Sequence, residues 1–243
     1  MLQIKTHDGP ARLGNYLELK TPGILKPDAS LPFIQDEPMP YDVSKSLAEF
    51  SVQQTIQKAR ESKKAGVAVV HGSKYLELRI HCAQELEKLG NQVLLIANPE
   101  ELIRRPRDLV NMVVNIREAV NPNSALYFPW VKTSFIPLLC YMGVDLFGDA
   151  ACDFYAQLDL MMTPNTIYNL KEYNLYDFSR EELKSYNRNA LDFVLREVRE
   201  NIKNGTLRNL VEERCCSHPE AMSALRMLDR DYGAFLDKYT PLF

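Results

Sequence analysis

The sequence predicts an α/β fold in which a parallel sheet is followed by a C-terminal helical segment. Short apolar runs that suit buried strands alternate with amphipathic helical patterns, and the connections between them are short. From about residue 179 onward the pattern is helical only. We count five or six strands of the βα type, whereas a closed TIM-type (β/α)8 barrel has eight. The count therefore predicts a shortened or incomplete (β/α)8 barrel, or an open parallel sheet.

The composition is that of an ordinary soluble globular protein. Of the 243 residues, 25% are charged and 46% are hydrophobic, and the formal net charge is −3. This mild acidity argues against binding of nucleic acid by bulk charge alone. No run of 18 apolar residues occurs and the first residues lack the apolar core of a signal peptide, so we expect a cytoplasmic protein without a membrane segment. The five cysteines lack CxxC spacing, which predicts buried, reduced thiols.

We expect a single domain over residues 1–243, with no internal repeat or long linker. Glycines and prolines punctuate short alternating runs in residues 1–30, which predicts short strands or an N-terminal hairpin. The βα units occupy residues 31–160, and the first of their strands is expected at residues 31–35. The C-terminal helices occupy residues 179–243.

The first long helix is predicted to begin at Ser44 or Ser46. Ser46 and Glu49 have the spacing of a capping box, in which each side chain caps the other residue's backbone N–H. The apolar residues expected near one face of this helix are Leu47, Phe50, Ile56 and Ala59. Gly66 is expected to end the helix.

The alternation continues along the chain. The strands expected after this helix are residues 67–70, 92–97, 125–128 and 144–147. The helices expected between them are residues 74–89, 107–120 and 134–142. In the helical tail, a stripe of apolar residues is expected to pack as core against the sheet; it consists of Leu191, Val194, Leu195, Val198 and Ile202. The tail is interrupted at Gly205, and helices at residues 207–214 and 218–238 follow.

Several residues with catalytic or recognition chemistry follow the predicted strands. They are Asp36, His71, Gly72, Ala97, Asn98, Pro129, Trp130, Gly148 and Asp149. Because the carboxyl ends of parallel strands meet at one edge of a sheet, we expect Asp36, His71 and Asp149 to share a pocket. An imidazole and carboxylates there suit acid–base catalysis. The alternative, which spacing alone favours for any single one of these residues, is that the residue caps a helix or completes a turn.

Two further features have both a binding and a structural interpretation. Trp130, the only tryptophan, either stacks on a nucleic-acid base or covers the rim of the sheet, and burial is the favoured role. The basic cluster at residues 104–107 either contacts phosphates or forms a solvated face.

Several stretches match motifs of one protein family in the right order. Residues 69–79 (VVHGSKYLELR) resemble its V-V-Q-G-x-x-x-x-E-L-R motif, and residues 143–155 (GVDLFGDAACDFY) resemble G-x-D-L-F-D-S-A-A-x-x-x-Y. Residues 36–40 resemble its D-x-P-T-P motif, residues 11–22 its opening hairpin, and residues 196–241 its C-terminal helices. The chain thus resembles a shortened, degenerate member of the tRNA-guanine transglycosylase (queuine/archaeosine tRNA-ribosyltransferase) family, in particular the archaeal branch that includes archaeosine synthase.

This resemblance implies a transglycosylase-like domain with a (β/α)8 barrel and bound zinc. It implies exchange of a tRNA guanine for a 7-deazaguanine through an aspartate nucleophile, or further modification of that base. The nucleophile of the family corresponds to Gly148, and Asp149 is displaced from that position by one residue. The family's second catalytic aspartate lies in a D-S-G motif, which this sequence lacks, and base exchange by the chain alone is therefore not expected.

The other functional positions are carried over one at a time. The base-contacting glutamine of the family corresponds to His71, the small residues after the next strand correspond to residues 97–98, and Asp36 alone is kept. No catalytic residue is assigned with certainty by the resemblance; the candidates are His71 and Asp149. The ligand-binding candidates are Asp36, His71, Gly72, Asn98 and Asp149.

The family's zinc motif falls on residues that suit zinc poorly. The three cysteine positions hold Asn169, Lys171 and Asn174, and the distant histidine position holds Tyr186. Zinc selects thiolate and imidazole, which an ammonium, two amides and a phenol do not provide. We expect no zinc and no other cofactor.

Three interpretations follow from the resemblance. The first is a transglycosylase-like pseudoenzyme of archaeal tRNA modification (the archaeosine/7-deazaguanine pathway) that acts as a subunit or partner of a modification enzyme. It is favoured because the chain stops before the C-terminal domains of archaeosine synthase would begin; tRNA, a second copy or another chain are the candidate partners. The second is an enzyme of altered chemistry that acts on a 7-deazapurine-type ligand with Asp36, His71 and Asp149. The third is a structural relic that acts only through protein contacts.

Overall fold

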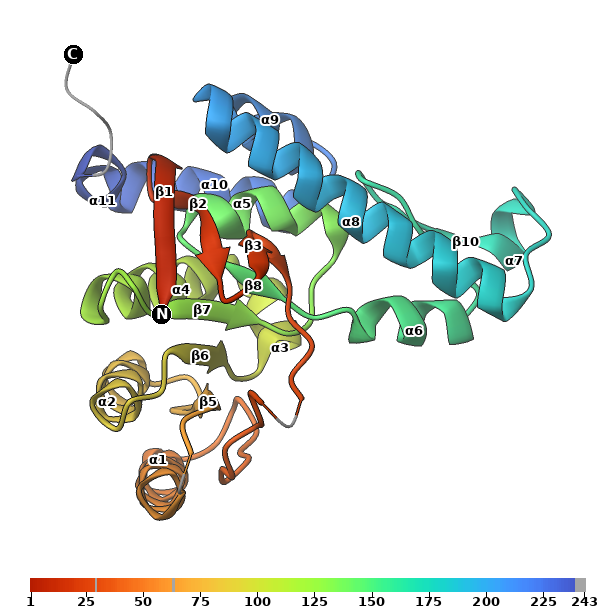
Figure 1. Cartoon of the computed structure of the whole chain (residues 1–243). Coiled ribbons are helices and arrows are strands. Elements are labelled where there is room, and N and C mark those ends of the chain that lie inside the picture. The colour runs from red at the N-terminus through yellow and green to blue at the C-terminus, as the bar shows by residue number, and fades with distance from the viewer. Residues whose placement is uncertain (29, 63, 239–243) are drawn as a thin grey trace.

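The computed structural model describes residues 1–28, 30–62 and 64–238, and its centre is a five-stranded parallel sheet (Figure 1). The strands in spatial order are β4 (Gly23–Ile24), β8 (Leu146–Phe147), β7 (Ala125–Phe128), β6 (Val93–Ile96) and β5 (Val67–Val70). All four neighbouring pairs are parallel. Within the described residues the end strands β4 and β5 do not pair with each other, so the sheet is an open, incomplete barrel. The predicted α/β fold with a shortened parallel sheet is confirmed.

An antiparallel sheet precedes the parallel one. It consists of β1 (Leu2–Asp8), β2 (Ala11–Tyr16) and β3 (Leu19–Thr21). The predicted N-terminal hairpin is therefore present, with a third strand added to it. Residues of this small sheet, such as Leu2 and Tyr16, are buried together with inward-facing residues of the parallel strands.

The strand predicted at residues 31–35 is wrong. Phe33 forms only an isolated bridge with Val67. Two backbone hydrogen bonds hold the segment: Ile34 N–H donates to the Val67 carbonyl and Val67 N–H donates to the Pro32 carbonyl, each at 2.9 Å. Pro32 has no N–H of its own, so it cannot extend the ladder. The segment covers part of the β5 edge without becoming a strand.

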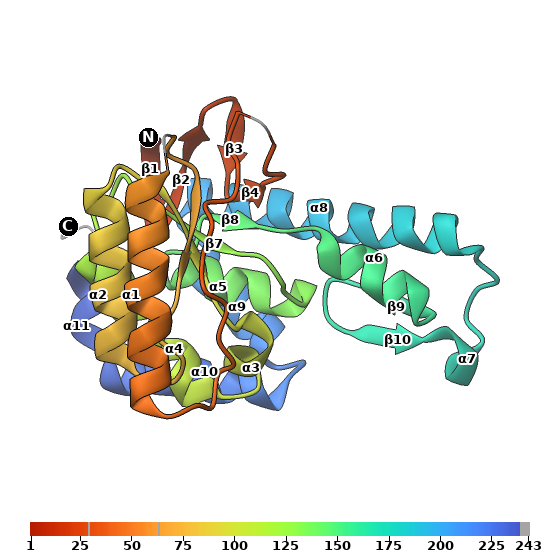
Figure 2. The same cartoon turned by 90° about the horizontal axis from the view of Figure 1, so that it is seen from below.

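Helices cover the outer side of the sheet (Figure 2). They are α1 (Lys45–Glu61), α2 (Leu76–Lys88) and α4 (Pro106–Ala119), and α2 packs between the other two. The helices predicted after β5 and β6 are confirmed, and the inward stripe of α4, from Leu109 to Val120, is buried. A short helix, α3 (Pro99–Ile103), was not predicted; it begins at a proline, which suits a first helical turn.

The predicted details of α1 are partly wrong. The helix begins after Ser44, no side chain caps its first turn, and the Ser46 capping box does not form. Ile56 is buried as expected, but Leu47 is 49% exposed and Phe50 is 48% exposed. Nine residues separate Leu47 from Ile56, which is about two and a half turns of helix. Leu47 and Phe50 therefore lie on the face of α1 opposite to the buried Ile56 and Ala59, and their side chains are exposed to solvent.

The chain after β7 is mainly helical. Its elements are η1 (Thr133–Phe135), α5 (Ile136–Tyr141), α6 (Ala150–Gln157), the hairpin β9 (Leu160–Met162) and β10 (Ile167–Asn169), α7 (Leu170–Tyr173), α8 (Arg180–Asn204), α9 (Leu207–Cys215), α10 (Pro219–Asp231) and α11 (Gly233–Lys238). Ser179 and Glu182 form a capping box at the start of α8, and Gly205 ends it at φ +66°. The helix expected over residues 218–238 is two helices, separated at Tyr232.

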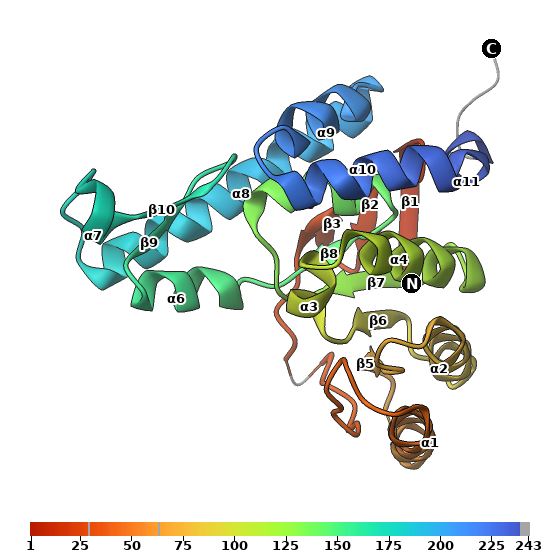
Figure 3. The same cartoon turned by 180° about the vertical axis from the view of Figure 1, so that it is seen from behind.

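The apolar stripe of α8 is buried, as predicted, but its main neighbours are not the parallel strands. Helix α8 packs mostly on α6, α5, α9 and on the strands β1, β2 and β9. Helix α9 packs against α8, and α10 packs against α9 and α4 (Figure 3). The first half of α8 extends away from the sheet together with α6, β9, β10 and α7 (Figure 2). We call this projecting part the arm.

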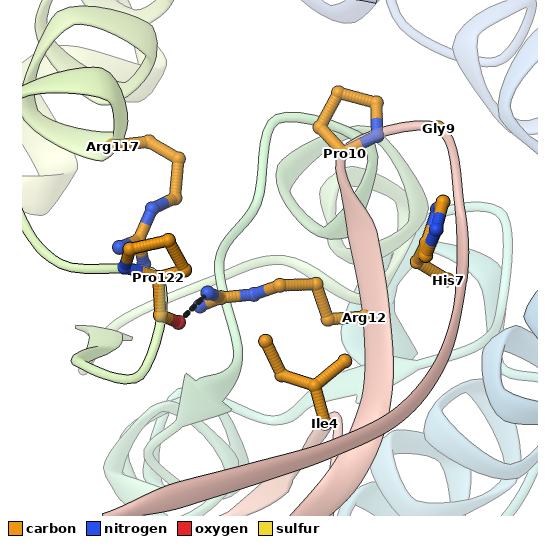
Figure 4. A pocket seen from close by; sticks show the side chains of 7 residues that line it. All are labelled: Ile4, His7, Gly9, Pro10, Arg12, Arg117 and Pro122. Atoms are coloured by element: carbon orange, nitrogen blue, oxygen red, sulfur yellow. Dashed lines mark hydrogen bonds between the residues drawn. The ribbon is translucent and has the colours of Figure 1, made fainter. Parts of the chain in front are cut away.

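A charged cluster lies at the amino ends of the strands. Asp145, just before β8, is buried; it pairs with Arg12 and accepts a hydrogen bond from Leu126 N–H at 2.9 Å. Arg12 also donates to the Pro122 carbonyl (Figure 4). Beside Arg12 is a cavity of about 80 Å³, lined also by His7 and Arg117. In barrels this end of the sheet serves stability rather than chemistry, and we assign the cluster that role.

Four of the five cysteines are buried, as predicted, and Cys216 is exposed. Burial raises the pKa of Cys82, Cys152 and Cys215 to about 12, so these thiols stay protonated near neutral pH. Across the residues that the structure describes, none of the helices combines the length and the apolar character needed to span a bilayer.

Candidate functional site

The carboxyl end of β5 and the loop beside it bring His71 and Asp36 together. His71 directly follows β5, and its Nε2 lies 2.7 Å from Oδ2 of Asp36. The histidine is buried, whereas the Asp36 side chain is 25% exposed. The pair is therefore anchored in the protein on one side and open to solvent on the other. The predicted encounter of these two residues is present in the structure.

The second imidazole nitrogen of His71 has no partner. Its Nδ1 is buried and makes no hydrogen bond within the described residues. A carboxylate at Nε2 favours the tautomer that carries the proton there, which leaves Nδ1 as a lone-pair acceptor. An imidazole oriented by a carboxylate is the arrangement that general bases use, although Nδ1 itself is buried here.

The loop that carries Asp36 is held by hydrogen bonds to its backbone carbonyls. Asn98 Nδ2 donates to the Met39 carbonyl at 3.0 Å, and Ser73 Oγ donates to the Pro40 carbonyl at 2.9 Å. Lys58 Nζ donates to the carbonyl of Asp36 itself at 2.6 Å. These contacts fix the position of Asp36 relative to the end of β5. The structure thus uses the Asn98 amide to hold the loop, and its contact with a ligand stays a prediction.

Arg79 connects the two neighbouring strand ends. The side chain is fully buried and donates to the Ser73 carbonyl at 2.7 Å, the Ala97 carbonyl at 2.9 Å and Asn98 Oδ1 at 3.0 Å. Burial lowers the pKa of Arg79 to about 10, which leaves it charged near neutral pH. A sequence signal for this residue exists, because Arg79 is the arginine of the E-L-R motif.

Gly72 is required by close packing. Its φ is +143°, and an added Cβ would lie 2.6 Å from the backbone nitrogen of Arg79. Only glycine lets the end of β5 approach the start of α2 so closely. A ligand contact by Gly72 also stays a prediction.

Asp149 makes its contacts elsewhere. Its Oδ2 lies 2.9 Å from Lys26 Nζ and 3.3 Å from Arg188 Nε. The second contact lacks hydrogen-bond geometry and is electrostatic. The expected trio is therefore only partly assembled: the partners of Asp149 come from the segment after β4 and from α8, while Asp36 pairs with His71. No sequence motif marks Lys26 or Arg188, and neither residue was predicted to lie at the site.

The backbone around Gly148 leaves no room for a side chain. An added Cβ would lie 2.4 Å from the Pro129 carbonyl oxygen and 3.0 Å from the Tyr127 hydroxyl. Burial, together with nearby Asp149, raises the pKa of Tyr127 to about 12, so its hydroxyl stays neutral. At the position predicted to correspond to the family nucleophile, neighbouring atoms fill the space that a side chain would need.

The four positions expected to bind zinc in the family have other partners here. Asn169 Oδ1 accepts a hydrogen bond from Lys171 N–H at 3.1 Å, and Lys171 pairs with Asp159 at 2.7 Å. Asn174 ends α7 in the left-handed conformation, and the Tyr186 ring packs 5.5 Å from that of Phe178. No cluster of three or more His, Cys, Asp or Glu suited to a metal occurs among residues 1–28, 30–62 and 64–238. The donor set does not fit zinc.

An open parallel α/β barrel with acid–base residues at its strand ends is the scaffold of a barrel enzyme or of a protein derived from one. The profile of the family described as queuine tRNA-ribosyltransferase matches residues 2–186. The chain belongs to this family. Its five-stranded sheet is a shortened, incomplete form of the (β/α)8 barrel that the family resemblance implied.

The chain is similar to several archaeal proteins. It is 39% identical over 137 residues to the archaeosine synthase of Methanocaldococcus jannaschii, which covers 56% of this chain and 23% of that protein. It is 30% identical over 234 residues to the tRNA-guanine(15) transglycosylase of Thermococcus kodakarensis, which covers 85% of this chain and 40% of that protein. The transglycosylase of M. jannaschii is 28% identical over 244 residues, with 86% and 37% covered. The chain spans less than half the length of each.

Proposed function

We propose that the chain is a transglycosylase-like protein of archaeal-type tRNA modification, in the archaeosine/7-deazaguanine pathway, without base-exchange activity of its own. In this proposal it acts as a subunit or partner of a modification enzyme. The observation that carries the proposal is the environment of Gly148: the position lacks a carboxylate and has no space for one.

The chemistry of base exchange explains why this position is decisive. Exchange through a covalent intermediate requires a carboxylate that reaches the anomeric carbon of the nucleotide. Asp149 is the nearest carboxylate in sequence, and it is engaged by Lys26 and Arg188. Two cations beside one carboxylate reduce its nucleophilicity and hold it away from the position of residue 148. Both observations support a protein that retains the family fold without the family's exchange step.

Exposed apolar side chains near the open edge of the sheet support a partner role. Leu47 and Phe50 are about half exposed on the same face of α1, which lies beside the β5 edge, and Phe33 on that edge is 56% exposed (Figure 1). In a closed barrel this side is covered by further βα units. A second protein that packs against α1 and Phe33 would bury the same surface.

The purified chain is expected to show no exchange of labelled guanine into tRNA, because residue 148 provides no nucleophile. The T. kodakarensis transglycosylase, under the same conditions, is the positive control. Incorporation above the protein-free background would contradict the proposal.

A pull-down from native lysate with the purified, tagged chain tests the partner role. The tagged chain is expected to retain a tRNA-modification enzyme from native lysate, and Phe50→Glu is expected to lose it because a charge replaces an apolar contact. Phe193→Glu, on the exposed side of α8, is the matched control and should retain the enzyme. Recovery of no modification enzyme by the wild type would contradict the partner role, and equal recovery by Phe50→Glu would exclude this surface.

A second candidate function is an enzyme of altered chemistry on a 7-deazapurine-type ligand, with Asp36, His71 and Asp149 as its reactive groups. The Asp36–His71 pair, with its unpartnered Nδ1, favours it. Under this candidate the wild-type chain binds preQ0, queuine or guanine in calorimetry, and His71→Ala abolishes binding. His81→Ala, an exposed histidine on α2, is the control. Absence of binding by the wild type would reject this candidate.

A further inference from the structure

A second hollow lies at the carboxyl end of the sheet, between α3, the segment after β7 and the start of α6. Its volume is about 210 Å³. The residues that define it are Glu100, Arg104, Trp130, Lys132, Phe154 and Tyr155. None of them is among the positions at which the family motifs place catalytic or zinc-binding residues. Figure 3 shows α3 and α6 at this end of the molecule.

One wall of the hollow is aromatic. The rings of Trp130 and Phe154 are 5.0 Å apart between centroids, at an angle of 68°, and Tyr155 lies 5.8 Å from Trp130. Trp130 is half-buried, whereas Phe154 is 46% exposed. The predicted cover of the sheet rim by Trp130 is therefore incomplete, and part of the aromatic surface is open to a ligand.

The charged side chains of the hollow are not engaged in hydrogen bonds or ion pairs with other described residues. In the part of the chain covered by the structure, the side chains of Glu100, Arg104 and Lys132 make no hydrogen bond and no ion pair. The next arginine, Arg105, differs because its guanidinium lies 4.9 Å over the Tyr41 ring. Two cations and one carboxylate thus surround an exposed aromatic wall, with their binding capacity unused.

We propose that this hollow is a binding site for one unpaired nucleotide of an RNA strand. The base stacks on the exposed ring of Phe154 with the Trp130 indole beside it, and Arg104 and Lys132 contact the flanking phosphates. Glu100 accepts a hydrogen bond from an amino group of the base or from a ribose hydroxyl. The hollow is smaller than the roughly 300 Å³ at which pockets for drug-sized ligands begin, so it suits a single base whose sugar and phosphates remain outside.

The choice of RNA as the ligand rests on the proposed role in tRNA modification. An isolated phosphate would not stack on the aromatic wall, and an apolar ligand would not interact favourably with the three charged side chains. A nucleotide contacts the aromatic wall with its base and the charged side chains with its phosphates and polar groups. Recognition by stacking and phosphate contacts is tolerant of sequence, so the site predicts contact with an unpaired segment rather than with a particular base.

Trp130 is the only tryptophan of the chain, so its fluorescence reports on this hollow alone. A base bound on Phe154 lies beside the indole and quenches its emission, and titration with a short single-stranded RNA is expected to give saturable quenching. Phe154→Ala is expected to weaken binding about 5- to 150-fold, the range measured for loss of one base-stacking contact. Arg104→Gln is expected to weaken binding and to reduce the slope of log K against log salt by about 0.7.

Arg226→Gln is the matched control, because Arg226 is an exposed arginine on α10 without an ion pair in the described chain. It should bind as the wild type does. No quenching by RNA, or equal affinity in Phe154→Ala, would overturn the proposal. Equal quenching by a polyglutamate peptide would show an anion surface without base stacking and would also overturn it. The titration does not depend on guanine exchange, so this proposal and the proposed function fail separately.

Discussion

Asp145→Ala is expected to lower the free energy of unfolding by about 3–5 kcal/mol. Asp145 is 1% exposed and accepts hydrogen bonds from Arg12 Nε at 3.0 Å and from Leu126 N–H at 2.9 Å. Its removal leaves the buried guanidinium of Arg12 without its counter-charge, and Arg117 Nη1, 4.0 Å away, adds a second cation nearby. The loss reflects an uncompensated buried charge rather than the net contribution of the Arg12–Asp145 ion pair to stability.

Urea unfolding of the wild type and of Asp145→Ala measures the difference in the free energy of unfolding. Asp192→Ala is the matched control, because Asp192 forms an exposed pair with Arg196 and its removal is expected to change stability by at most about 1 kcal/mol. The loss of unfolding free energy in Asp145→Asn should lie between those of Asp145→Ala and Asp192→Ala, since the amide oxygen still accepts a hydrogen bond from Leu126 N–H. A loss of less than about 1 kcal/mol in Asp145→Ala would mean that Arg12 reaches water, and the structural role assigned to the cluster would be wrong.

Gly148→Asp is expected to destabilise the protein and to leave guanine exchange undetectable. The new Cβ would meet the Pro129 carbonyl oxygen at 2.4 Å, and that atom belongs to backbone and cannot rotate away. Overpacking of this kind costs about 1–3 kcal/mol. The added carboxylate would also stand next to Asp149, and repulsion between like charges adds to the loss. The residue type of the family nucleophile would be restored without its position.

Thermal unfolding and the exchange assay together test this variant. Gly233→Asp is the matched control, because a Cβ at Gly233 meets no atom within 4 Å, and its stability is expected to stay close to that of the wild type. Exchange activity in Gly148→Asp would show that the rest of the catalytic site is intact. Wild-type stability in that variant would show that the backbone at Pro129 yields, which contradicts the steric argument.

Local patterns predicted most of the secondary structure because the signals are local. Apolar runs such as Val67–Val70 and Ala125–Phe128 formed buried strands, and the helical pattern expected from about residue 179 became α8. The predictions were wrong where contacts with other segments of the chain determine the local structure. The strand at residues 31–35 failed because only two backbone hydrogen bonds reach the β5 edge.

The sequence alone determined the family, the strand-end position of His71, and the absence of a carboxylate at residue 148. These conclusions depend on residue identity and on order along the chain. The tertiary structure decided that Asp36 and His71 meet at 2.7 Å, while Asp149 binds Lys26 and Arg188. It also decided that Gly148 has no space around it. Such contacts join segments far apart in sequence, and only packing brings them within bonding distance.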